Sequence, residues 1–120
     1  MIKDRLLNLP NEIEEKKLEL FNKTQGLEDI KARIKTWELM EIVDISNEVD
    51  EKGKAVYSND TKRQAELQER KDNSDVYKNY TDIAKSLEIE IANINIKLDK
   101  LFNEQSNLRA ICRLEGQADE

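Results

Sequence analysis

The sequence of 120 residues contains no histidine, one cysteine, one proline and three glycines. Without histidine, the chain lacks the commonest metal ligand and the usual base that activates serine and cysteine nucleophiles. Three glycines and one proline are too few for the many turns of an all-β protein. The single Cys112 excludes an intramolecular disulfide and favours a reducing compartment. The sequence therefore predicts a helical, cytoplasmic protein that is not an enzyme and binds no metal or cofactor.

The chain carries 26 acidic and 20 basic residues, which gives a formal net charge of −6. This charge argues against tight non-specific binding to nucleic acid, because that binding requires clustered lysines and arginines. We expect no membrane span, since no apolar run approaches about 18 residues. The N-terminus also lacks the apolar core of a signal peptide. Hydrophobic and charged residues each make up 38%, which suits narrow apolar stripes between helices rather than a broad core.

The clearest pattern lies in the C-terminal half, where apolar residues recur at alternating spacings of four and three, as in a coiled-coil seam. Its members are Tyr80, Ala84, Leu87, Ile91, Ile94, Leu98, Leu101, Gln105, Leu108 and Cys112. This seam predicts a helix over about 75–114, which needs a partner helix to be stable. Alternation within residues 87–98 would also fit a β-hairpin that turns at Ala92-Asn93. The absence of a turn glycine and the unbroken heptad favour the helix.

The N-terminal half carries a weaker copy of this seam. Isoleucine or leucine recurs every seven residues from Ile13 to Ile34, and Ile30 and Trp37 fill the second seam position. After Trp37 the phase shifts, as at a coiled-coil stutter. We therefore expect a long helix over about 10–51, with Pro10 in its first turn. A loop and a short polar helix should occupy residues 52–74.

Together these elements predict an all-α fold: one helical domain over residues 1–120, built as an elongated antiparallel helical hairpin, or coiled coil, with a short helical insert at the connection. Ile89 and Ile96 fall opposite the main seam, with the small Ala92 between them. A hairpin that buries a single stripe would leave these residues exposed. They therefore suggest a second helix contact, and we expect self-association into a dimer or tetramer.

The most unusual segment spans residues 36–51, where no basic residue lies between Lys35 and Lys52. Its acidic residues mix with apolar ones, and a 3-4-3 spacing should place several carboxylates on one helical face. A solvated acidic face over a buried core would explain this pattern. The alternative is a docking surface for a basic protein. The candidate partner-binding residues are Trp37, Glu38, Glu41, Asp44, Glu48 and Glu51.

Basic residues gather in the predicted short helix, close to a tyrosine that could stack on a base. These candidate nucleic-acid contacts are Tyr57, Lys62, Arg63, Arg70 and Lys71. Nearby acidic residues nearly cancel their charge, so a solvated polar helix is the alternative interpretation.

Residues 53–67, Gly-Lys-Ala-Val-Tyr-Ser-Asn-Asp-Thr-Lys-Arg-Gln-Ala-Glu-Leu, together with Val76-Tyr77, resemble small coiled-coil proteins of phages and prophages of Gram-positive bacteria. This resemblance implies an accessory role in recombination, replication or counter-defence, and it assigns no functional residue. The leading hypothesis is a protein-binding adaptor or inhibitor that uses the acidic segment. The alternatives are a nucleic-acid-handling accessory protein and a structural assembly component.

Overall fold

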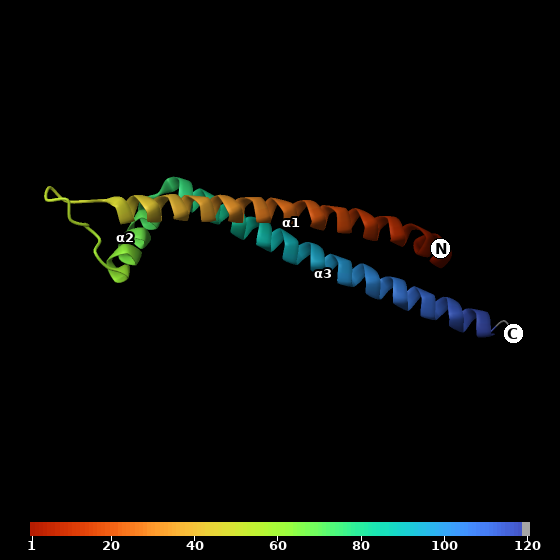
Figure 1. The fold of residues 1–120 in the computed structure, drawn as a ribbon. Coiled ribbons are helices and arrows are strands. Elements are labelled where there is room, and N and C mark those ends of the chain that lie inside the picture. The colour runs from red at the N-terminus through yellow and green to blue at the C-terminus, as the bar shows by residue number, and fades with distance from the viewer. Residues whose placement is uncertain (119–120) are drawn as a thin grey trace. The chain divides into compact units, whose positions relative to one another are not determined.

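The computed structural model describes residues 1–118, which form two long helices and one short one. Helix α1 spans Ile2–Asn47, α2 spans Asp60–Asn73 and α3 spans Asp75–Ala118 (Figure 1). Among the described residues, β-type pairing is limited to one isolated bridge between Val49 and Ala55. The predicted all-α fold, with two long helices joined through a short helical insert, is therefore confirmed.

The contacts divide the chain into two compact units. The first unit comprises Met1–Gly26 and Leu87–Glu120, and the second comprises Leu27–Ser86. Because α1 and α3 are each unbroken helices with residues in both units, this division does not test the prediction of a single domain.

In the first unit, α1 and α3 run antiparallel and enclose a small apolar core. The antiparallel direction is evident from two ion pairs, Arg5–Glu104 and Lys23–Glu90. The core consists of Leu9, Ile13, Ile94, Leu98 and Leu101, with Leu6, Leu20 and Leu108 packed against it. All ten predicted seam positions of α3 are buried or half-buried. The seam was therefore predicted correctly.

The predicted start of the first helix, at about residue 10, is wrong. The helix begins at Ile2, and Pro10 lies inside it although proline cannot donate a backbone hydrogen bond. Burial explains the difference, because Leu9 is fully buried and Leu6 packs beside it. Apolar burial of this kind outweighs the cost of one lost backbone hydrogen bond.

The predicted end of that helix, at about residue 51, is also wrong, because α1 ends at Asn47. A tight turn follows, in which the side chain of Asp50 accepts hydrogen bonds from the backbone N–H groups of Lys52 and Lys54, both at 2.9 Å. Gly53 adopts φ of 76°, a left-handed conformation that glycine tolerates without strain. These local hydrogen bonds compete with the helix and stop it early.

Ion pairing in the first unit predicts a pH-dependent stability. The guanidinium of Arg5 donates to both carboxylate oxygens of Glu104, at 2.6 and 3.0 Å, and this lowers the pKa of Glu104. A carboxyl group with a lowered folded-state pKa stabilises the fold above its unfolded pKa of about 4.3, and the contribution is lost as the pH falls through the folded value. Urea unfolding should show Glu104→Gln less stable than wild type near neutral pH, with the gap closing toward about pH 3. A gap that is unchanged across this range would contradict the assignment.

Candidate functional site

The candidate site lies in the second unit, where α2 packs on the end of α1. Asn59 caps the start of α2, and its side chain accepts a hydrogen bond from the N–H of Lys62 at 2.9 Å. The helix ends before Ser74, whose hydroxyl in turn accepts from the N–H of Tyr77 at 3.1 Å and so caps α3. Leu67 is the buried residue of α2. With so little apolar surface buried, the position of α2 depends strongly on its polar contacts.

Arg70 of α2 is the centre of these contacts. Its guanidinium binds Glu41 at 2.9 Å, Asp44 at 2.7 Å, Glu48 at 3.3 Å and Glu66 at 3.0 Å. We call these four carboxylates the acidic cluster. Their hydrogen bonds raise the pKa of Arg70, so the guanidinium stays charged. Four carboxylates around one cation leave a local excess of negative charge, which favours the approach of further cations.

A second group of contacts lies beside the acidic cluster. Lys71 pairs with Glu38 at 3.3 Å, and the hydroxyl of Tyr77 donates to the same carboxylate at 3.3 Å. The rings of Trp37 and Tyr77 lie 4.8 Å apart with a 40° tilt. The ammonium group of Lys71 also lies 5.5 Å from the centre of the Tyr77 ring. The polar and aromatic contacts thus hold α1, α2 and the start of α3 together.

The predicted acidic face is present, but it is neither continuous nor simply solvated. Arg70 binds three of its carboxylates, those of Glu41, Asp44 and Glu48. Lys71 binds a fourth, that of Glu38. The prediction that Glu51 continues this helical face is wrong, because α1 ends at Asn47 and Glu51 lies exposed in the following turn. Glu48 also follows the helix, yet its side chain reaches Arg70.

Most of the residues predicted to contact nucleic acid are engaged in contacts within the chain. Arg70 and Lys71 are engaged by carboxylates, and Nε of Arg63 donates to the carbonyl oxygen of Tyr57 at 3.1 Å. Tyr57 is half-buried, and its burial together with nearby carboxylates raises its pKa. Lys62 is exposed. Nucleic-acid contact by this set stays a prediction, without added support from the geometry.

A shallow hollow opens between α1 and α2, and we call it the acidic hollow. Its lining residues are Trp37, Glu41, Glu66, Glu69, Arg70, Asn73 and Ser74. Glu66 and Glu69 were not predicted as site residues, because they lie on a different helix from the acidic segment. The (i, i+4) spacing of Glu66 and Arg70 could have predicted that these two side chains form an ion pair on one face of the helix.

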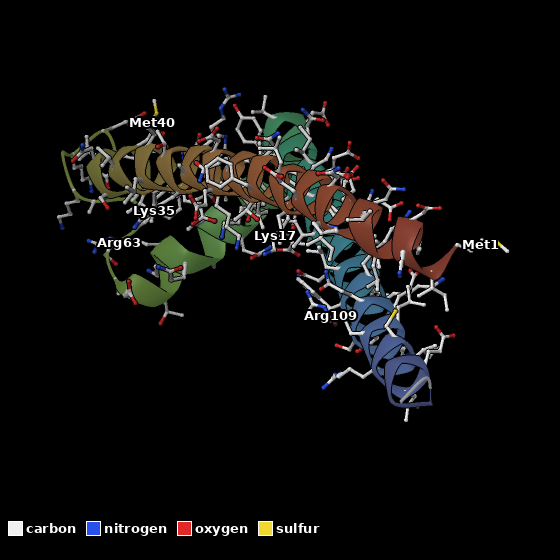
Figure 2. The ribbon with its side chains drawn as sticks, turned by 90° about the vertical axis from the view of Figure 1, so that its right-hand side faces the viewer. Met1, Lys17, Lys35, Met40, Arg63 and Arg109 are labelled. Carbon is white, nitrogen blue, oxygen red and sulfur yellow. The ribbon has the colours of Figure 1, made fainter. Side chains whose placement is uncertain are left out.

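Apolar residues are exposed on α3, where self-association was predicted, and also on α1. Ile89 and Ile96 of α3 are 63% and 67% exposed, and Ala92 is also exposed. On α1, Met40 projects from the side that faces away from α2 (Figure 2), and with Leu39 and Val43 it leaves apolar surface exposed.

No protein-family model, curated protein or solved structure matches this chain. Throughout residues 1–118, no helix has an apolar stretch of the length needed to cross a bilayer. In the same part of the chain, no group of three metal-ligating side chains is arranged to hold a metal ion.

Proposed function

We propose that this protein acts as an adaptor or inhibitor that binds a basic segment of another protein in the acidic hollow. The observation that carries the proposal is the composition of that hollow, in which the indole of Trp37 and the carboxylates of Glu41, Glu66 and Glu69 line one concave surface. Lysine and arginine side chains bind both carboxylates and the faces of aromatic rings, so this combination suits a basic side chain.

The packing of α2 supports the same chemistry. The chain itself docks an arginine-lysine pair, Arg70 and Lys71, onto the carboxylates of α1. The carboxylates of this region outnumber these two cations, and Asp44 keeps 73% of its side chain exposed despite its contact with Arg70. A partner that presents basic residues would therefore meet uncompensated negative charge, which accelerates association and selects for basic surfaces.

The resemblance of residues 53–67 to phage and prophage coiled-coil proteins extends the proposal to a biological setting. In that setting the basic partner would be a protein that normally binds DNA phosphates, and occupation of its basic surface would inhibit it. Such a partner would use the same lysine and arginine side chains for phosphates and for carboxylates.

Fluorescence of Trp37, the single tryptophan of the chain, provides a direct test. We expect titration with an arginine-rich peptide to change this fluorescence and the binding to weaken with added salt. Glu69→Gln should weaken binding several-fold, because it removes a carboxylate from the hollow while leaving the contacts of Arg70 in place. Glu28→Gln, which removes the same charge from an exposed site elsewhere on α1, is the matched control and should bind like wild type.

Equal binding by Glu69→Gln and Glu28→Gln would reject the hollow as the site, because the position of the removed carboxylate would then have no effect. Absence of any binding at low salt would reject the proposed function altogether.

A further inference from the structure

We propose that two copies of this chain form an antiparallel dimer through the outer face of α3, with a two-fold axis at Ala92. Because α3 is one unbroken helix over Asp75–Ala118, helix geometry alone decides which of its residues share a face. Five residues at alternating spacings of four and three form a single stripe. They are Lys85, Ile89, Ala92, Ile96 and Asp99, and all five are exposed in the single chain.

The centre of this stripe is apolar. Ile89 and Ile96 leave 63% and 67% of their surface in water, and covering this surface would be favourable. They project away from the seam by which α3 packs on α1, so α1 does not cover them. Ala92 lies between them with a small side chain, and a small residue at a crossing point lets two helices approach closely.

The charges of the stripe are complementary to those of a second copy. Lys85 precedes Ala92 by seven residues and Asp99 follows it by seven. When Ala92 faces Ala92 of the other copy in an antiparallel pair, each Lys85 therefore faces Asp99 of the other copy. The same register brings Ile89 beside Ile96 of the other copy, because these residues lie three and four positions from Ala92. The stripe is therefore complementary to itself in both charge and apolar surface, which favours a second copy over an unrelated partner.

Light scattering on the full chain tests the dimer at concentrations up to about 0.1 mM, since dimerisation follows mass action. Wild type should give about twice the chain mass of 14.0 kDa. Lys85→Asp places two aspartates opposite each other at both ends of the interface, and Asp99→Lys does the same with lysines. Each variant should dimerise at least about tenfold more weakly than wild type. Arg109→Asp changes an exposed residue of α3 that is not a member of the stripe, and it should dimerise normally.

An equimolar mixture of Lys85→Asp and Asp99→Lys provides the decisive arm of the experiment. In the mixed pair every aspartate faces a lysine, so the mixture should dimerise about as tightly as wild type and more tightly than either variant alone. Circular dichroism should show unchanged helix content, because both positions are exposed. A monomeric wild type, unaffected single variants, equal loss in Arg109→Asp, or a mixture that stays monomeric would each overturn the proposal. Because this interface uses no residue of the acidic hollow, its failure would leave the proposed function standing.

Discussion

Replacement of Leu9 by alanine should lower the free energy of unfolding by about 3 kcal/mol. Leu9 is fully buried and belongs to the core of the first unit, together with Ile13, Leu98 and Leu101. Truncation removes apolar contacts and leaves a cavity that two rigid helices cannot close by small movements. For a chain of this length the loss corresponds to a fall in melting temperature of roughly 10 °C, which thermal unfolding followed by circular dichroism would measure.

Leu7→Ala is the matched control for this experiment. Leu7 lies two residues away on the same helix but is 75% exposed, so its truncation should change stability by less than about 0.5 kcal/mol. Similar losses in both variants would contradict the assigned orientation of α1.

Replacement of Arg70 by alanine should cost about 2 kcal/mol, because one guanidinium makes charge-assisted hydrogen bonds to several carboxylates. The loss is no larger because the side chain of Arg70 keeps 22% exposure, and solvent screens such contacts. Loss of Arg70 also leaves Glu41, Asp44 and Glu66 to repel one another. We expect the amides of α2 to lose protection from hydrogen exchange, while those of the first unit keep theirs.

Two further variants separate the geometry of Arg70 from its charge. Arg70→Lys keeps the charge but cannot reach several carboxylates at once, so its stability should lie between those of wild type and Arg70→Ala. Lys62→Ala removes an exposed cation from the same helix and should have little effect. If Lys62→Ala and Arg70→Ala were equally destabilised, the acidic cluster would have no specific role in holding α2.

Much of the fold was predictable because heptad spacing reports directly which residues face a partner helix. The seam of α3 was predicted residue by residue, since its apolar positions run without interruption from Tyr80 to Cys112 apart from Gln105. The start of α1 was predicted incorrectly, because a proline is typical of the first turn of a helix and Pro10 lies well inside this one. Continuing the spacing backward by seven residues from Ile13 and Lys16 reaches Leu6 and Leu9. Leu9 belongs to the core, and Leu6 packs against it.

The candidate site was less predictable, because it depends on contacts between residues far apart in the sequence. The acidic residues of α1 and the basic residues of α2 were each recognised, but as separate surfaces for separate partners. Their pairing through Arg70 joins positions more than 20 residues apart, and no local spacing reports such a contact. The early end of α1 was missed for a different reason. Gly53 indicates where the turn lies, but the hydrogen bonds to the side chain of Asp50 end the helix several residues before that glycine.

The most direct test of the acidic hollow is a hydrogen-exchange map of the full chain with and without a saturating arginine-rich peptide. Added protection should be confined to the segment of α1 around Trp37 and Glu41 and to residues 66–74. Glu69→Gln should reduce that protection, whereas Glu28→Gln should not. Protection spread evenly over all acidic segments of the chain, or confined to segments outside the acidic hollow, would contradict the account.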